Sequence, residues 1–279
     1  MASSTVNLGG NGLLIVPRVA DPAWIAEHGA PSVDIIAVHG LNGGRWSTWS
    51  EGNTMWLQDL LPSKLTSARI MTFGYNADVV GNFSTLQVRD HSRKLLSLLR
   101  DKRSSEAETI RPIVFLCHSL GGIIVKQALR IATNEDRYNP IASATKGIVF
   151  FGTPHRGADL AFWGEMLARL GKACFLRPPK DLIKDLRNNS KTVMDVSEDF
   201  RSIVDKYAIV SFYEEDKLHG IDKEVVPKSS ALMEVSHEDA IPLEGNHMKI
   251  CKFSGEQDER FEQVWKAIER VINTGPRRT

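Results

Sequence analysis

The stretch Phe115–Gly122, Phe-Leu-Cys-His-Ser-Leu-Gly-Gly, constrains the fold of this chain more than any other. A short apolar run of the kind found in buried strands leads up to Ser119. Apolar residues then recur at helical spacing over 123–131, so a helix begins just after the serine. A serine on such a sharp strand-to-helix turn is a nucleophile elbow, which needs small residues two positions before and after it. Cys117 and Gly121 occupy those positions. The alternative is an ordinary strand-turn-helix in which the serine only caps the helix.

Strand and helix patterns alternate along the rest of the chain. Buried-strand patterns are expected at 33–38, 69–75, 113–117, 147–151, 208–213 and 239–243, and an added edge strand at 13–16. Helical patterns are expected near Trp46–Leu57 and at 86–99, 123–131 and 261–271, with a surface loop at 101–109. Such alternation predicts an α/β fold with a mostly parallel sheet and helices on both faces.

The expected domain organisation is a lead-in, residues 1–30, followed by one domain, residues 31–275. Glycines and a proline interrupt regular structure in the lead-in. Residues 158–205 break the alternation with two helical patterns separated by Pro178 and Pro179. Their length suits a lid over the carboxyl ends of the strands, although two further helices packed on the sheet would explain the same pattern.

Composition excludes several classes of protein. The 35 Lys and Arg nearly cancel the 34 Asp and Glu, so the chain carries no electrostatic footprint for nucleic acid. The three cysteines lack paired or metal-ligand spacing, which suits a reducing compartment and implies no metal. No apolar run reaches the roughly 18 residues of a membrane span, and the N-terminus lacks a signal-peptide pattern. We therefore expect a soluble cytoplasmic protein without a cofactor.

A serine, an acid and a histidine follow strand ends in the order Ser119, Glu214, His247. This order is typical of hydrolases in which the histidine takes the serine proton and the carboxylate orients the imidazole. Glu214 follows its strand directly, whereas Glu215, Asp216 and Asp222 stay open as alternatives for the acid. The other seven histidines, which fit the base role less well, are His28, His39, His91, His118, His155, His219 and His237.

Two further groups complete the expected site. The strand 33–38 ends in His39-Gly40, where a backbone N–H, that of Leu41, can pair with the N–H of Leu120 to form an oxyanion hole. In the 158–205 segment, Phe162, Trp163 and Met166 are expected to line an acyl pocket if that segment is a lid.

Several motifs together resemble the α/β-hydrolase domain of the SERAC1-like lipase/esterase group, and within it the SesB-like domains at the N-terminus of fungal NOD-like receptors. These motifs are Asp34–Gly43, Arg111–Gly122, Gly152–Gly157, Ser211–Glu214 and Asn246–Phe253. The resemblance covers roughly residues 31–272. It implies an α/β-hydrolase fold, a triad of Ser119, Glu214 and His247, an oxyanion hole at Leu41 and Leu120, and further domains in a longer receptor chain.

The expected function is hydrolysis of carboxylic esters, plausibly lipid esters, through an acyl-enzyme on Ser119. The lid would make transient contact with a membrane, and the oligomeric state is left open. The alternative is a signalling module that uses the same fold as a scaffold without turnover.

Overall fold

The computed structural model of the protein describes residues 10–76, 85–175, 180–221 and 223–274. Within these residues, seven strands form one sheet in the order β1-β5-β2-β6-β7-β8-β9. Their bounds are β1 Gly12–Ile15, β5 Ala68–Gly74, β2 Val33–Val38, β6 Ile113–His118, β7 Thr145–Phe151, β8 Ala208–Glu214 and β9 Glu238–Leu243. Only β1 pairs antiparallel, at one edge against β5. The predicted mostly parallel sheet, including its edge strand, is confirmed.

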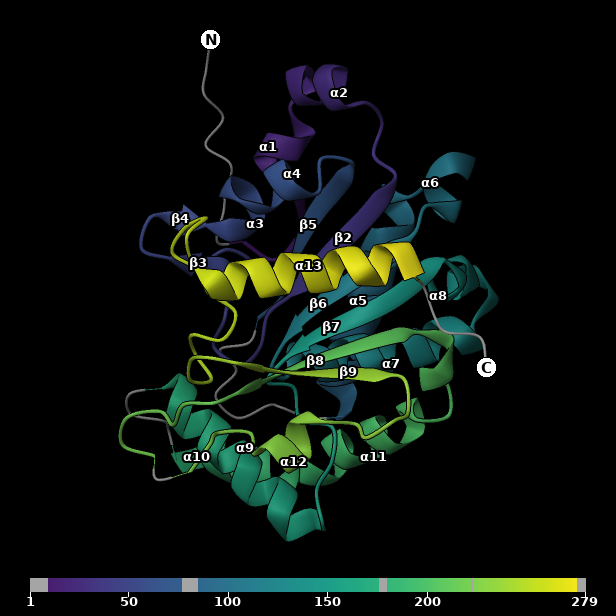
Figure 1. Cartoon of the computed structure of the whole chain (residues 1–279). Helices are drawn as coiled ribbons and strands as arrows, with labels where there is room; N and C mark the ends of the chain where they lie inside the picture. Colours follow the sequence, from purple (N-terminus) through teal and green to yellow (C-terminus); the bar gives the residue numbers. More distant parts are fainter. Residues whose placement is uncertain (1–9, 77–84, 176–179, 222, 275–279) are drawn as a thin grey trace.

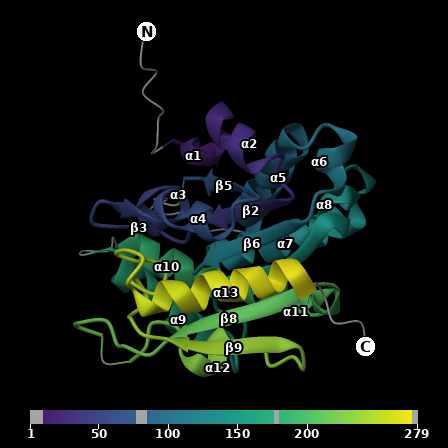
Figure 2. The ribbon, with the colours of Figure 1, turned by 45° about the horizontal axis from the view of Figure 1, so that its top comes forward.

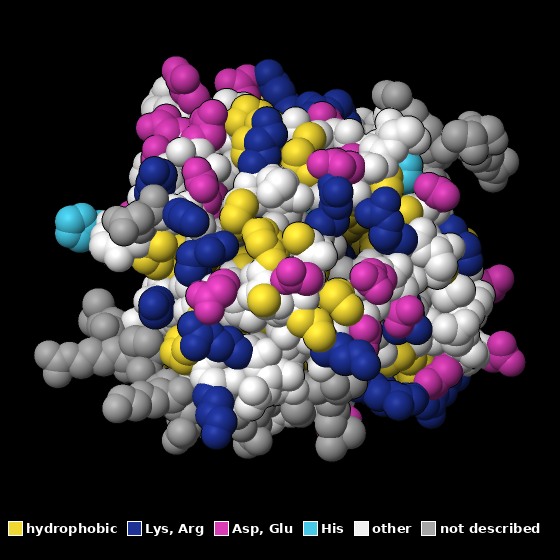
Figure 3. All heavy atoms as spheres, turned by 90° about the horizontal axis from the view of Figure 1, so that it is seen from below, with side chains coloured by type: hydrophobic (Ala, Val, Ile, Leu, Met, Phe, Trp, Pro, Cys, Tyr) yellow, Lys and Arg dark blue, Asp and Glu magenta, His cyan; other side chains and the backbone are white. Residues whose placement is uncertain are grey.

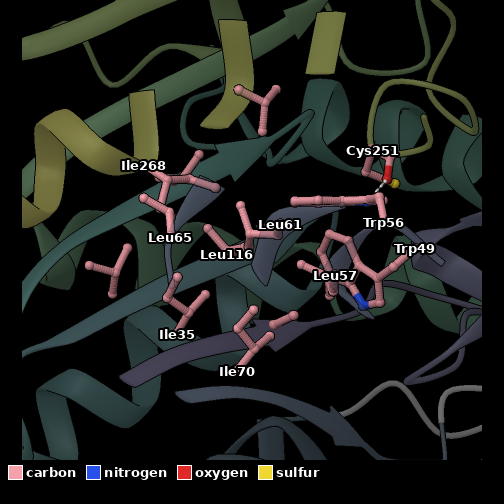
Figure 4. Packing of buried hydrophobic residues seen from close by; sticks show 14 of the residues in the cluster. Ile35, Trp49, Trp56, Leu57, Leu61, Leu65, Ile70, Leu116, Cys251 and Ile268 are labelled. Atoms are coloured by element: carbon pink, nitrogen blue, oxygen red, sulfur yellow. Dashed lines mark hydrogen bonds between the residues drawn. The ribbon is translucent and has the colours of Figure 1, made fainter. Parts of the chain in front are cut away.

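One face of the sheet is covered by α13 (Glu259–Thr274), which lies across the strands in Figure 1. The short helices α1 (Pro17–Ala20), α3 (Trp56–Asp59) and α4 (Leu61–Lys64) extend this layer, and α2 (Pro22–His28) follows α1. Figure 4 shows how Trp49 and Trp56 pack among aliphatic side chains of the sheet and of these helices. The Trp56 indole N–H donates to the carbonyl of Cys251 at 2.9 Å, so this buried polar group is satisfied.

The opposite face is covered by α5 (Thr85–Lys102), α7 (Gly121–Asn134) and α8 (Asn139–Ala144), with α6 (Glu106–Ile110) beside them. Figure 2 shows these helices and α13 on opposite sides of the strands. Apolar side chains of α5 and α7 pack against those of β6 and β7 in a second buried cluster. Helices therefore cover both faces, as the sequence predicts.

A third group of helices lies beside the carboxyl ends of the strands. It comprises α9 (Leu160–Cys174), α10 (Lys180–Asn188) and α11 (Ser190–Phe200), which we call the cap, together with α12 (Lys228–Ala231). A separate apolar cluster joins the cap to the sheet ends and includes Leu41, Leu120, Trp163 and Met166.

Some local predictions are wrong. Instead of one helix near Trp46–Leu57, the chain forms a 3₁₀ turn at Ser47–Trp49, a hairpin of β3 (Ser50–Glu51) and β4 (Thr54–Met55), and α3. Gly52 has a φ of 57°, a left-handed conformation that turns the hairpin and ends helical continuity. The loop expected at 101–109 contains the start of α6, where Ser105 and Glu108 form a capping box.

Candidate active site

Ser119 lies between β6 and α7 with a φ of 53°. A non-glycine residue in the left-handed region is strained, and here the Ser119 N–H is held by the carbonyl of Phe151 at 2.9 Å. The turn needs Gly121, because a Cβ there would lie 2.4 Å from the carbonyl oxygen of Val38. Cys117 tolerates a side chain because it is the fifth residue of the buried strand β6 and packs in the core. The local geometry is that of a nucleophile elbow.

His247 faces Ser119 from the loop after β9. Its Nε2 lies 3.0 Å from Ser119 Oγ, within hydrogen-bond distance, and both residues are fully buried. The Nδ1 of His247 lies 3.5 Å from Oε1 of Glu214, the last residue of β8. That Oε1 also accepts the N–H of Val226 at 2.6 Å, which fixes the carboxylate in its place.

The contact between the acid and the imidazole is longer than a hydrogen bond. Among the described residues, neither Nδ1 of His247 nor Oε2 of Glu214 has a hydrogen-bond partner. Of the other acids considered, Glu215 and Asp216 are exposed, and Asp222 lies outside the described residues. The structure thus brings Glu214, and neither of its two exposed neighbours, to the ring of His247.

The loop after β2 carries the predicted oxyanion N–H. His39 Nδ1 lies 2.9 Å from the carbonyl oxygen of Gly40, while the N–H of Tyr75 faces His39 Nε2 at 3.3 Å. A carbonyl can only accept, so Nδ1 carries the proton, and burial lowers the pKa of His39 to about 4. Since Gly40 C=O and Leu41 N–H belong to one trans peptide, anchoring the oxygen turns the Leu41 N–H in the opposite direction.

Both predicted oxyanion donors lack a hydrogen-bond acceptor among the described residues. Within the part of the chain that the structure describes, the N–H groups of Leu41 and Leu120 donate to no protein acceptor. The loop approaches the elbow closely, since a Cβ on Gly40 would lie 2.7 Å from Ser119 Cβ. Leu120 also caps the N-terminus of α7, whose dipole favours negative charge there.

The cap packs against the loops that carry Leu41 and Leu120. Trp163 and Met166 of α9 are buried in the apolar cluster that contains Leu41 and Leu120, and Phe162 packs at its margin. The Asn42 amide donates to the carbonyl of Cys174, the last residue of α9, at 2.5 Å. The three side chains predicted for an acyl pocket therefore lie in the same cluster as the oxyanion residues.

His118, one of the histidines that fit the base role less well, has its side chain directed to the loop of His247: Nε2 lies 2.9 Å from the His247 carbonyl oxygen. The two rings are 5.1 Å apart, and burial together with His247 lowers the pKa of His118 to about 3. No sequence pattern indicates this contact, which joins residues 129 positions apart.

The described residues contain no group of three or more His, Cys, Asp or Glu side chains that could hold a metal ion. Nor is any described helix long and apolar enough to span a bilayer.

Comparison with known proteins supports the fold. No family model matches the chain. SERAC1 of Mus musculus is 27% identical over 251 residues, which covers 78% of this chain and 36% of that protein. SERAC1 of Bos taurus is 28% identical over 248 residues with the same coverage. The chain is homologous to SERAC1. It spans about a third of the length of these curated relatives.

Among solved structures, the α/β-hydrolase enzyme MGS-MChE2 from a lagoon-sediment metagenome aligns with a TM-score of 0.52 at 15% identity. The alignment covers 86% of this chain and 92% of MGS-MChE2. The chain therefore has the α/β-hydrolase fold predicted from its sequence. The finer likeness to SesB-like receptor domains stays a prediction.

Proposed function

We propose that the protein is a serine hydrolase that cleaves carboxylic esters through an acyl-enzyme on Ser119. The observation that carries this proposal is the 3.0 Å contact between Ser119 Oγ and His247 Nε2 beside two unengaged N–H groups. A scaffold needs neither a strained serine nor unpaired backbone donors beside it.

The arrangement supports an acyl-transfer mechanism. His247 Nε2 takes the hydroxyl proton as Ser119 Oγ attacks the ester carbonyl, and the negative charge forms on the carbonyl oxygen. The Leu41 and Leu120 N–H groups and the N-terminus of α7 stabilise that charge. His247 then gives the proton to the departing alkoxide, and water regenerates the serine by the same steps. Glu214, buried beside His247, favours the imidazolium.

We also propose that the segment 158–205 is a lid and that the substrate is a lipid ester. This proposal is supported by Trp163 and Met166 of α9, which pack in the apolar cluster that contains Leu41 and Leu120. Figure 3, which views the molecule from the cap side, displays apolar side chains gathered between charged ones, and Leu160 is 45% exposed. Such a surface suits transient contact with a lipid aggregate. Replacing Trp163 by Ala should lower kcat/KM more for octanoate than for acetate esters, because each buried methylene contributes about 0.8 kcal/mol.

Further proposals concern the cellular setting. The resemblance to receptor domains suggests that the chain acts as one domain of a longer protein in the cytoplasm, with no nucleic-acid partner and no cofactor. The rival function is a scaffold without turnover.

The decisive experiment is fluorophosphonate labelling of the wild type and of Ser119→Ala, with p-nitrophenyl ester hydrolysis measured in parallel. We expect labelling at Ser119 and a loss of about 10⁴–10⁶ in kcat in a folded Ser119→Ala variant. An unlabelled wild type without turnover would favour the scaffold.

A further inference from the structure

His118 connects three parts of the proposed site. It immediately precedes Ser119 in the elbow, and its Nε2 lies 2.9 Å from the main-chain carbonyl of His247. Its Nδ1 faces the oxyanion loop, since a Cβ on Gly40 would lie 3.3 Å from that atom. His118 is buried, with 4% of the residue exposed. No other histidine of the described residues hydrogen-bonds to His247.

The chemistry of the contact fixes its direction. A carbonyl oxygen offers only lone pairs, so Nε2 of His118 carries the proton and donates. The ring stays neutral at ordinary pH, because burial and the nearby His247 lower the pKa of His118 to about 3. The donor therefore does not compete for the proton that His247 receives during turnover.

The hydrogen bond from His118 to the His247 carbonyl matters because Glu214 holds the imidazole of His247 only loosely. The distance from Glu214 Oε1 to His247 Nδ1 is 3.5 Å, and Nδ1 has no hydrogen-bond partner among the described residues. The turn that follows is closed internally, with the Asn246 carbonyl accepting the N–H groups of Lys249 and Ile250 at 2.9 and 3.0 Å. Those bonds shape the loop but do not tie it to β6.

We propose that His118 is a positioning residue that ties the main chain of His247 to the elbow and so keeps the imidazole on the serine hydroxyl. This inference rests on the proposed esterase function. Catalytic groups must be held within roughly 0.5 Å, and a misplacement of about 1 Å can cost about 100-fold in rate.

The test compares His118→Gln with His118→Met and His118→Phe. The glutamine amide nitrogen is as many bonds from Cβ as the histidine Nε2, so it can donate to the same carbonyl; methionine keeps the length, and phenylalanine the ring, without a donor. His155→Met is the control, because His155 is equally buried but hydrogen-bonds to His247 in no described contact. Two donor-free variants are used so that the test still works if one of them fails to fold.

We expect the donor-free variants to lose about 10- to 100-fold in kcat for p-nitrophenyl esters, with KM changed less than about twofold. His118→Gln should recover to within about fivefold of the wild type, and His155→Met should match the wild type. In the pH profile of kcat/KM, the fall in activity on the acid side should stay at the same pH in every variant, because His118 is not the base. Equal losses for Gln and Met, no loss for Met, or disappearance of this fall on the acid side would each overturn the inference.

A second readout does not need turnover. The ring ¹⁵N resonances of His247 should shift in His118→Met and return toward their wild-type positions in His118→Gln. If the wild type resists fluorophosphonate while this pattern holds, the esterase proposal fails and the positioning role stands. Unchanged His247 resonances in His118→Met would overturn the positioning role itself.

Discussion

Two buried clusters of ionisable groups occupy opposite ends of the same sheet, and they differ in how completely their atoms are paired. At the amino ends, Asp34 of β2 accepts both Nε and Nη2 of Arg69, at 2.8 and 2.9 Å, and is also bonded by Arg103 and Arg111. Nη1 of Arg69 also donates to Oε1 of Glu108 at 2.7 Å. At the carboxyl ends, Nδ1 of His247 and Oε2 of Glu214 lack partners in the described part of the chain.

This difference separates what stabilises the fold from what can react. Each oxygen of the Asp34 carboxylate accepts two guanidinium hydrogen bonds, so this carboxylate cannot accept a proton or a substrate without losing bonds. The other end holds a strained serine, an underbonded imidazole and free N–H groups, an arrangement that folding alone does not favour. Substitutions at the two ends should therefore affect different measurements.

The largest expected effect is on turnover, from Glu214→Gln. The change keeps the size of the side chain but removes the charge that stabilises the imidazolium, so kcat should fall by up to about 10⁴, as for neutralised acids in other triads. Glu215→Gln, at an exposed neighbour, is the matched control and should change kcat less than about twofold. Steady-state hydrolysis of p-nitrophenyl esters measures both.

Asp222→Asn belongs in the same experiment, because that residue lies outside the described part of the chain and remains a candidate acid. A loss larger for Asp222→Asn than for Glu214→Gln would assign the acid to the later loop and refute the role of Glu214.

At the amino end, Asp34→Asn should affect stability instead. It leaves three guanidinium groups beside a neutral side chain, and breaking a buried ion pair on one side costs about 3–5 kcal/mol. Urea unfolding measures the loss, while kcat of the folded fraction should stay within about twofold. Asp101→Asn, whose carboxylate is 62% exposed beside Arg100, should cost less than about 0.5 kcal/mol. Equal losses for the two variants would contradict the comparison.

The sequence predicts the five inner strands well because each is a short apolar run whose residues are mostly buried on both faces. It also brings Ser119, Glu214 and His247 to one edge, since parallel strands end on the same side. The hairpin at Ser50–Met55 escapes prediction because Trp49 and Trp56 mimic helical spacing while packing on each other edge to face. The bond from His118 to His247 escapes it because only the fold brings β6 and the loop after β9 together.

The stability of the carboxyl end of the sheet should also respond to acid. His39 and His118 have folded pKa values of about 4 and 3, below the usual 6.5, because burial disfavours their charged forms. An imidazole with a lowered folded pKa contributes stability that is complete above pH 6.5 and is lost as the pH falls toward the folded pKa. Between pH 7 and pH 5 each should cost about 2 kcal/mol, at about 1.4 kcal/mol per pH unit below 6.5.

The His118→Gln variant isolates one of these contributions. Its free energy of unfolding should fall by about 2 kcal/mol less than that of the wild type between pH 7 and pH 5, as urea titrations at the two pH values would measure. Identical pH dependence in the two proteins would mean that His118 does not stay neutral in the folded state.

The smallest effect expected is the backbone strain at Ser119. Ser119→Gly and Ser119→Ala both remove the hydroxyl, so their difference in unfolding free energy isolates the cost of a Cβ at a φ of 53°. Glycine should be the more stable variant by about 1 kcal/mol, because an L-residue pays roughly 1–2 kcal/mol in the left-handed region. Ser92, buried inside α5, is the matched control, and there alanine should be more stable than glycine by about 1 kcal/mol. If alanine were the more stable variant at both positions, the elbow would store no strain, and the contrast between the two ends of the sheet would rest on hydrogen bonding alone.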